Sequence, residues 1–340
     1  MSDFQSYSEK AIHWEIELTT RCNSTCIGCS RFANYFYPNP NINTQLELSL
    51  EELEKALKQS KSIDFIFLCG VYGDPMLHSK IFEALDLIKF YAPEVKIVVD
   101  TNASFGTEEF WIKLAPYFSQ SGSHIKFCID GQSESHELFR RGTQWEKILA
   151  NAKAFINAGG NAVWKMIQFE HNAGEEVELE KLSKSLGFKK FELRKNNYSG
   201  MDTFITTAAT TISDIGMQQR KWTPDQVNDW NTKQMEGHED KEIACYSLEK
   251  TNLYLDAHGS VWPCSWIASM PFRPEDGLRG VIENRVLEKY EKSFNSLRRN
   301  SLHQILNHQW FARDLAESWN NSSLIAMCLK RCGKCKAKEY

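Results

Sequence analysis

Strand-like and helix-like stretches alternate along residues 14–193, and this alternation restricts the fold of the chain more than any other feature. Six largely apolar stretches have the length and composition of β-strands, and helical patterns separate them. The strands are predicted at 14–19, 63–68, 95–99, 125–129, 162–169 and 188–193. Strands that alternate with helices in this way form parallel βαβ units. The predicted fold class is therefore α/β.

Six units are too few to close an eight-unit barrel. The pattern alone leaves a partial barrel and a doubly wound sheet both open. In either architecture the reactive groups lie beyond the carboxyl ends of the strands. Polar or cysteine-containing segments follow four of the predicted strands at that end, at 22–29, 70–75, 101–102 and 130–131. We expect the functional site where these segments meet.

Two capping boxes predict where helices begin. Ser49 followed by Glu52 predicts a helix through residue 58, and Thr143 followed by Glu146 predicts one through residue 158. Beyond the alternating region, the polar segment 201–242 is predicted to be a connector or lid. Residues 253–264 then have the pattern of two short strands around a turn.

The ten cysteines call for a chemical explanation. The start of the chain is polar and lacks a secretory signal, and no apolar run is long enough to span a membrane. These features predict a cytoplasmic protein, in which thiols stay reduced and disulfides are rare. Metal binding is then the first role to consider for clustered cysteines. By contrast, Cys69 and Cys128 stand alone in apolar runs and are expected to be buried.

Cys22, Cys26 and Cys29 follow the first predicted strand with the spacing C-x3-C-x2-C. A structural zinc site normally takes four ligands, and three thiolates from one loop are unusual for a catalytic zinc. A [4Fe–4S] cluster normally takes four thiolates. Three would leave one iron open to an exogenous ligand. The spacing therefore favours an iron–sulfur cluster, while zinc stays an alternative.

This motif, placed after the first strand of an α/β chain, resembles the radical S-adenosylmethionine (radical SAM) superfamily. The resemblance implies a partial (β/α)6 TIM-like barrel and an open iron that chelates S-adenosylmethionine. One electron then cleaves the sulfonium, and the resulting 5′-deoxyadenosyl radical abstracts a hydrogen atom from a substrate. It also implies that the three cysteines of the loop are both the metal ligands and the catalytic residues.

Further positions resemble the cofactor-binding segments of this superfamily. Tyr72-Gly73-Asp74 resembles its Gly-Gly-Glu-Pro-like stretch, which holds the ammonium of the bound methionine. The other positions that the resemblance assigns to S-adenosylmethionine are Asn102, Asp130 and Arg141, the last within Arg140-Arg141-Gly142. A bidentate arginine would pair with the methionine carboxylate.

Two positions depart from the superfamily pattern. Gly28 replaces the aromatic residue that often precedes the third cysteine, so adenine contacts would come from elsewhere, for example Phe32 or Tyr35. Cys128 stands where a serine is usual, and a thiol is a weaker hydrogen-bond donor than a hydroxyl.

Five more cysteines lie near the C-terminus. The spacing of Cys245, Gly259 and Cys264 resembles the SPASM and twitch extensions of the same superfamily. Five thiols suit one auxiliary [4Fe–4S] cluster, with Cys245 and Cys264 as two ligands. The other two ligands would come from Cys328, Cys332 and Cys335, and spacing does not choose among these. A zinc ribbon from the same thiols is the alternative. The resemblance thus predicts a barrel at 1–200, a connector at 201–242 and a twitch-type domain at 243–340.

The predicted function is a radical SAM enzyme that acts on a small-molecule or peptide substrate, with the auxiliary cluster assisting oxidation or substrate positioning. A flavodoxin- or ferredoxin-like protein would supply the electron. The first predicted strand begins at residue 14, so we expect no N-terminal leader-binding domain. This favours a small molecule, such as a sugar or nucleotide derivative, or a peptide that binds without that domain. A formal net charge of −4 argues against general nucleic-acid binding. The competing prediction is a non-catalytic zinc-binding interaction module.

Overall fold

A computed structural model describes residues 4–33, 37–196, 223–236, 241–273, 277–320 and 325–335. Its centre is an eight-stranded sheet in the order β11-β10-β1-β4-β5-β6-β7-β8. Six of these strands, in the alternating region, are parallel to their neighbours and lie in chain order. They are β1 (Ala11–Ile16), β4 (Ser62–Leu68), β5 (Lys96–Thr101), β6 (His124–Cys128), β7 (Ala162–Gln168) and β8 (Lys190–Lys195).

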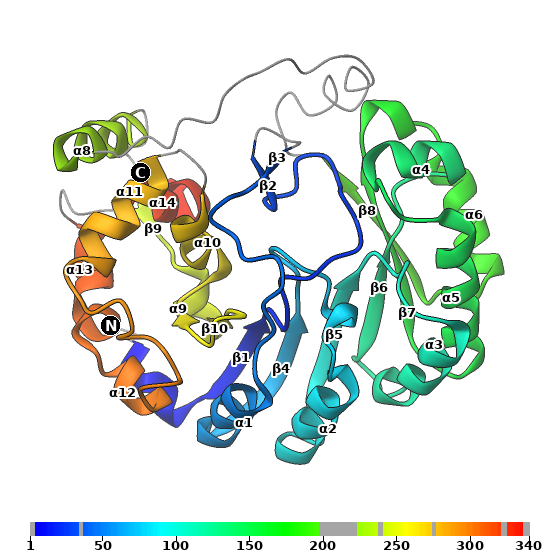
Figure 1. Ribbon diagram of the computed structural model, residues 1–340, viewed down its shortest axis with the longest axis horizontal. Helices are drawn as coiled ribbons and strands as arrows, with labels where there is room; N and C mark the ends of the chain where they lie inside the picture. The colour runs from blue at the N-terminus through cyan, green and yellow to red at the C-terminus, as the bar shows by residue number, and fades with distance from the viewer. Residues whose placement is uncertain are drawn as a thin grey trace, which may run out of the picture.

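Helices cover the outer face of this curved sheet, and the carboxyl ends of its strands converge on the loop after β1 (Figure 1). The helices of the alternating region are α1 (Leu50–Gln59), α2 (Ile81–Tyr91), α3 (Glu108–Leu114), α4 (Ser133–Phe139), α5 (Trp145–Asn157) and α6 (Glu176–Ser185). The two-residue strands β2 (Phe32–Ala33) and β3 (Tyr37–Pro38) form an antiparallel pair above the sheet in Figure 1. The predicted α/β partial barrel of six units is confirmed.

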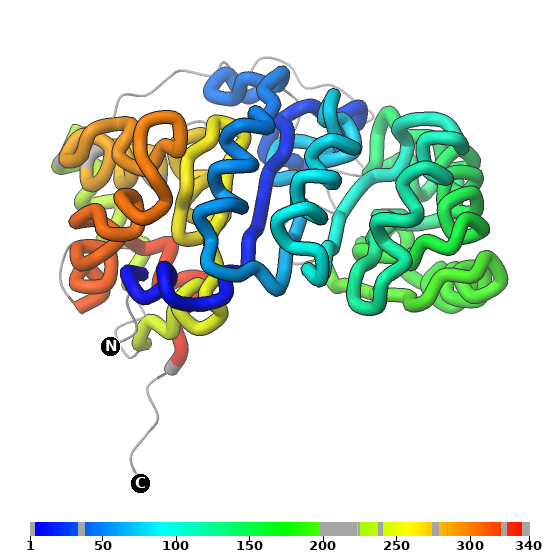
Figure 2. The backbone as a smooth tube through the Cα atoms, turned by 90° about the horizontal axis from the view of Figure 1, so that it is seen from below, coloured from blue at the N-terminus to red at the C-terminus, as the bar shows by residue number. Residues whose placement is uncertain are grey.

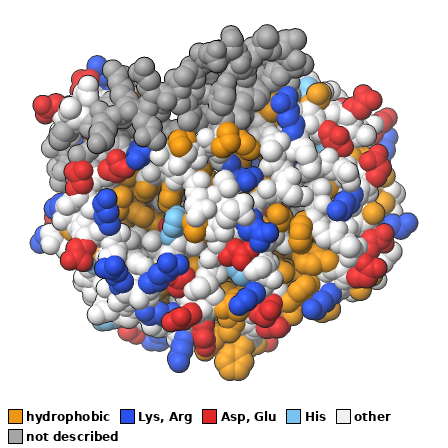
Figure 3. All heavy atoms as spheres, in the orientation of Figure 1, with side chains coloured by type: hydrophobic (Ala, Val, Ile, Leu, Met, Phe, Trp, Pro, Cys, Tyr) orange, Lys and Arg blue, Asp and Glu red, His pale blue; other side chains and the backbone are white. Residues whose placement is uncertain are grey.

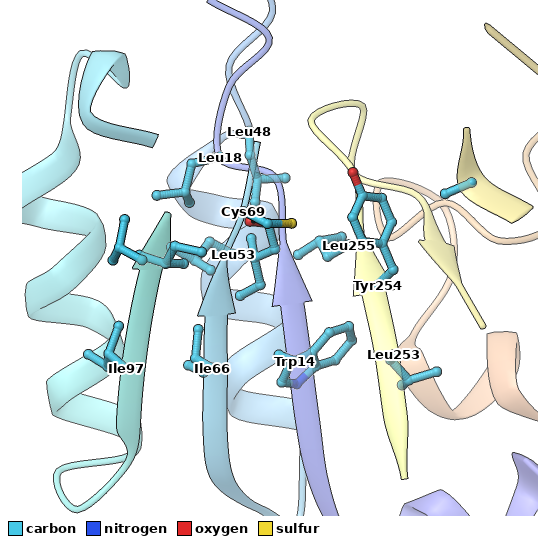
Figure 4. Packing of buried hydrophobic residues seen from close by; sticks show 14 of the residues in the cluster. Trp14, Leu18, Leu48, Leu53, Ile66, Cys69, Ile97, Leu253, Tyr254 and Leu255 are labelled. Atoms are coloured by element: carbon cyan, nitrogen blue, oxygen red, sulfur yellow. The ribbon is translucent and has the colours of Figure 1, made fainter. Parts of the chain in front are cut away.

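Side-chain alternation along the strands separates the core from the barrel interior. In β1, Ile12, Trp14 and Ile16 are almost fully buried against the helices, whereas the residues between them point to the inner side. Figure 4 shows one buried side chain from each of four neighbouring strands in a row: Ile97, Ile66, Trp14 and Leu253. One apolar layer therefore runs from the alternating region into the C-terminal part.

One predicted capping box is confirmed and the other is wrong. Ser49 caps α1, and Glu52 bonds back to it as expected. Helix α5, however, begins at Trp145 behind Gln144 and has no side-chain cap. Its predicted cap, Thr143, donates its hydroxyl to the carbonyl oxygen of Arg140 at 2.6 Å. The intervening helix α4 was not predicted.

The C-terminal part continues the same sheet. The predicted strand pair is confirmed as β10 (Asn252–Leu255) and β11 (Val261–Trp262), and β10 pairs with β1 in parallel. The remaining strands form a small pair, β9 (Lys241–Ile243) with β12 (Gly333–Cys335). Helices fill the rest: α8 (Pro224–Lys233), α9 (Tyr246–Lys250), α10 (Ser265–Ala268), α11 (Gly277–Ile282), α12 (Leu302–Leu306), α13 (Leu315–Ser318) and α14 (Ala326–Cys332), with π-helical turns at Glu283–Leu287 and Trp310–Asp314.

The N-terminal segment packs against the C-terminal helices. The 3-10 helix Phe4–Glu9 lies beside them in Figure 2, and the rings of Phe4 and Phe311 are 5.6 Å apart. Of the predicted connector, residues 201–222 and 237–240 lie outside the described residues. No helix of the described ranges is long and apolar enough to cross a membrane.

Candidate active site

The loop after β1 carries Cys22, Cys26 and Cys29 at the carboxyl end of the sheet, and all three are half-buried. The loop is tied to the segment after α4 by main-chain hydrogen bonds. The amide of Thr25 donates to the carbonyl oxygen of Arg141 at 2.8 Å, and the hydroxyl of Ser24 donates to the same oxygen at 3.2 Å. The three thiols are therefore held together by backbone that is itself anchored.

Several polar groups point at the sulfur atoms. The amide N–H of Ser24 donates to Cys22 Sγ at 3.4 Å, and the side-chain amide of Asn102 donates to the same sulfur at 3.6 Å. The hydroxyl oxygen of Ser24 lies 2.8 Å from Cys26 Sγ. Donors of this kind surround cysteine sulfurs that carry negative charge, as in iron–sulfur sites.

Burial raises the pKa of the Cys22 thiol to about 12 and that of the Cys29 thiol to about 11. Thiolates at these positions therefore need a cation that coordinates them. The described residues include no set of three His, Cys, Asp or Glu side chains arranged to hold a single metal ion. The donor set of this loop, three sulfurs with N–H groups directed at them, fits an iron–sulfur cluster.

The turn after β4 packs directly against the cysteine loop. A Cβ atom on Gly73 would lie 1.9 Å from the carbonyl oxygen of Thr19, so only glycine allows this approach. The amide of Asp74 donates to the carbonyl oxygen of Arg21 at 2.8 Å. The structure thus places Tyr72, Gly73 and Asp74 beside the loop, as the sequence predicts.

The carboxylate of Asp74 is engaged by protein donors in the structure. It accepts hydrogen bonds from the amide of Met76 at 3.0 Å, the hydroxyl of Thr101 at 2.9 Å and the amide of Asn102 at 2.7 Å. Asp74 therefore joins the turn after β4 to the end of β5. Asn102 in turn reaches the cysteine loop, because its side-chain amide donates to Asn23 Oδ1 at 2.9 Å.

Asp130 is completely buried and paired with Arg140 rather than Arg141. Its Oδ2 lies 2.6 Å from Arg140 Nε, and its Oδ1 accepts from the amide of Ile167 at 2.5 Å. The guanidinium of Arg140 interacts electrostatically with Cys26. The structure assigns a main-chain role to Arg141, whose carbonyl oxygen holds the cysteine loop. Asp130 positions Arg140 near that loop.

Glu17, which the sequence analysis missed, is a central residue of this site. It follows β1 directly and is 1% exposed. Its Oε1 accepts from the amide of Tyr72 at 2.5 Å, the amide of Gly73 also donates to the carboxylate, and its Oε2 accepts from the Tyr254 hydroxyl at 2.9 Å. The signal that could have identified it is a second carboxylate, after Glu15, near the carboxyl end of the predicted strand 14–19.

Four C-terminal thiols lie close enough to interact electrostatically with one another. The interaction between the Cys245 and Cys332 thiols raises the pKa of Cys245 and lowers that of Cys332. Cys264 and Cys328 interact electrostatically with both of these residues. Of Cys335 the structure describes only the main chain, in β12.

The two solitary cysteines are buried, as predicted. Cys69 and Cys128 are 7% and 6% exposed. Of the two aromatic residues considered for adenine, Phe32 lies beside the loop with its ring 5.8 Å from the Arg31 guanidinium carbon. Tyr35 lies outside the described residues. Acidic and basic side chains are interspersed over the face shown in Figure 3, without one dominant sign.

Comparison with known proteins supports the fold of this chain. The family model of the radical SAM superfamily matches residues 16–169. Streptococcus suis SuiB bound to S-adenosylmethionine is 13% identical with a TM-score of 0.50, over 80% of this chain and 65% of SuiB. This chain thus spans less than two thirds of SuiB.

A second similar structure is anSMEcpe with bound AdoMet and the Kp18Cys peptide. It is 14% identical with a TM-score of 0.53, over 93% of this chain and 84% of anSMEcpe. At such identities the likeness concerns the fold alone. No curated protein matches this chain.

Proposed function

We propose that the protein is a radical SAM enzyme, because the family model of that superfamily matches residues 16–169. In this proposal the loop after β1 binds S-adenosylmethionine, and the enzyme abstracts a hydrogen atom from a substrate in the barrel. The observation that carries the proposal is the anchored loop that presents Cys22, Cys26 and Cys29 at the carboxyl end of the sheet. When bound there, a [4Fe–4S] cluster supplies the electron that converts S-adenosylmethionine into the 5′-deoxyadenosyl radical.

The neighbouring residues would hold the cofactor in place. The backbone of Tyr72 and Gly73 would face the methionine ammonium, and Glu17 fixes the conformation of this turn. Asp74 would act chiefly by joining the turn to Asn102. Fixing cofactor and substrate in contact, with water excluded, is the main contribution of a protein to radical chemistry.

The remaining cofactor contacts would come from the segment after β6. We assign the methionine carboxylate to the arginine pair at 140–141, with Asp130 holding Arg140 at 2.6 Å. A bidentate guanidinium suits this carboxylate. In this arrangement Asp130 acts on the cofactor through Arg140, because both of its oxygens already accept protein hydrogen bonds.

We further propose that Cys245, Cys264, Cys328 and Cys332 hold an auxiliary [4Fe–4S] cluster. The electrostatic interactions among these four thiols support this choice. Such a cluster would take an electron from the substrate radical or position the substrate. The division into a barrel at 1–200, a connector at 201–242 and a twitch-type domain at 243–340 belongs to the same proposal.

The substrate is a small molecule or a peptide, and a flavodoxin- or ferredoxin-like protein would supply electrons. The bound peptide in anSMEcpe supports the peptide class for this fold. The competing function, a zinc-binding interaction module, would use the same thiols without cleaving S-adenosylmethionine.

Anaerobic purification and reconstitution should give a brown protein with about eight irons per chain, the content of two [4Fe–4S] clusters. Dithionite and S-adenosylmethionine should then release 5′-deoxyadenosine, measured by liquid chromatography and mass spectrometry. A colourless protein that contains zinc and releases no 5′-deoxyadenosine would instead support the interaction module.

Asn102→Ala should lower the midpoint potential of the cluster that responds to S-adenosylmethionine. The Asn102 amide donates to Cys22 Sγ, and such a bond stabilises the more negative, reduced cluster. The measurement is an anaerobic redox titration followed by electron paramagnetic resonance. Asn161→Ala is the matched control, because Asn161 bonds main-chain oxygens of Gln120 and Ser123 at the other end of the strands. Equal potentials in both variants would contradict this role.

A further inference from the structure

The inner face of strands β5 to β8 carries charged side chains. Barrels of this kind are usually filled by branched apolar residues. Here Ile97 and Val99 of β5 are fully buried on the helix side, so the residue that follows Val99, Asp100, points inward. By the same alternation Lys126 of β6 and Lys165 of β7 point inward, since Ile125 and Trp164 face the helices.

Two ion pairs cross this wall. Asp100 Oδ2 lies 2.5 Å from Lys165 Nζ, and Lys126 Nζ lies 3.1 Å from Glu192 Oε2. Each pair reaches over one intervening strand. The four side chains are 15–20% exposed, so they border open space and are accessible from it. Ion pairs contribute little net stability, both where they are exposed to water and where they are buried. Their position inside the barrel therefore indicates a role in binding.

The two ion pairs differ in whether both oxygens of the carboxylate have a hydrogen-bond partner. Glu192 Oε1 accepts a second bond from Lys190 at 2.9 Å. Asp100 Oδ1, by contrast, is buried and has no hydrogen-bond partner among the described residues. The Lys165 ammonium has three N–H groups, of which one serves Asp100. The Asp100–Lys165 pair thus offers an acceptor directly beside donors.

Building on the proposed function, we propose that Asp100 and Lys165 recognise the substrate, and that the substrate is a free α-amino acid. Its ammonium would donate to the exposed part of the Asp100 carboxylate, and its carboxylate would accept from Lys165. An α-amino acid carries these opposite charges side by side, as the protein pair does. A peptide backbone offers the same positions without the charges, and charged hydrogen bonds are about twice as strong as neutral ones.

The neighbouring wall indicates the kind of side chain. Phe67 of β4 points to the inner side and pairs in register with Val98 of β5. Val98 precedes Asp100 by two residues and therefore points to the same side. Both lie next to the charged pair and are apolar. The proposed substrate is therefore an amino acid with an apolar side chain, which would lie against Phe67 and Val98.

The first experiment uses the reconstituted enzyme with S-adenosylmethionine, dithionite and fully deuterated L-leucine, L-isoleucine, L-valine or L-phenylalanine. Deuterium should appear in 5′-deoxyadenosine with at least one of them. The N-acetyl and carboxamide derivatives, which each lack one charge, should transfer at least tenfold less. Equal transfer from the derivatives, or 5′-deoxyadenosine free of deuterium with all four amino acids, would overturn the inference. Absence of 5′-deoxyadenosine would refute the proposed function instead.

The second experiment measures binding without turnover, by calorimetric titration of the same amino acids into the reconstituted protein with S-adenosylmethionine. Lys165→Met and Asp100→Asn should each weaken binding about tenfold or more, the effect of one lost charge-assisted hydrogen bond. Lys126→Met removes the other ion pair of the same wall and should change affinity less than threefold. Similar losses in all three variants would mean that the pairs act only structurally, and absence of binding to the unmodified protein would also overturn the inference.

Discussion

Replacing Cys26 by alanine is expected to abolish the reductive release of 5′-deoxyadenosine. The iron content should fall by about four per chain, the content of one [4Fe–4S] cluster. The fold should persist, because Cys26 is half-buried in a loop that main-chain bonds to Arg141 and Phe139 hold in place. Iron analysis, circular dichroism and the 5′-deoxyadenosine assay test these expectations together.

The matched control is Cys69→Ala, which removes a thiol of the same size from the barrel interior. Cys69 lies 3.4 Å from Glu15 Oε1 and has no place in either proposed ligand set. Its variant should keep the full iron content. Release of 5′-deoxyadenosine by Cys26→Ala at the rate of the unmodified protein would show that the loop is not the site of cleavage.

The second large effect is expected at Glu17. Glu17→Ala leaves the amides of Tyr72 and Gly73 and the hydroxyl of Tyr254 without their buried acceptor. Each buried donor without a partner costs about 1–3 kcal/mol. We therefore expect a loss of several kcal/mol in the free energy of unfolding and weak binding of S-adenosylmethionine. Glu17→Gln keeps one acceptor and the side-chain volume, and it should restore most of both properties.

The pH dependence of stability should identify the same residue. Burial raises the pKa of Glu17 to about 8. Between its ordinary pKa and about 8 the folded protein holds a proton that the unfolded chain releases. The contribution of Glu17 to the free energy of unfolding is therefore complete at low pH. It falls by about 1.4 kcal/mol per pH unit above the ordinary pKa and is lost once the pH has risen through 8.

Other buried acids, among them Asp74 and Asp256, contribute slopes of the same sign. The comparison that isolates Glu17 is therefore urea unfolding of the unmodified protein and Glu17→Gln at pH 5.5 and pH 8.5. The unmodified protein should lose more stability between these two pH values than the variant. Equal losses would mean that Glu17 keeps its ordinary pKa in the folded state.

Much of the barrel could be predicted because its strands are encoded locally. The apolar run 63–68 lies within β4, and the Ser49–Glu52 box begins α1 where expected. Thr143 does not cap α5 because its hydroxyl donates to a nearby main-chain oxygen, an alternative that short polar side chains offer. The pairing of β10 with β1 joins residues far apart in the chain, and no local pattern carries that information.

In the candidate site, too, some features follow from local sequence and others only from the packed structure. The cysteine loop and the turn with Gly73 lie together because both follow strands of one parallel sheet, which their positions in the sequence already indicated. What Asp74, Asp130 and Glu17 contact could not be predicted. A carboxylate at a strand end can face a ligand or bond neighbouring amides, and only the packed structure shows that these three bond the protein.

The parallel pairing of β10 with β1 determines how a truncated form of this protein should behave. Cutting the chain after the six-unit barrel would strip β1 of its neighbour and leave a row of open amide and carbonyl groups along an apolar edge. Such a fragment should self-associate instead of behaving as a minimal enzyme. The C-terminal part, through β10, therefore completes the sheet of the barrel and is not a detachable accessory.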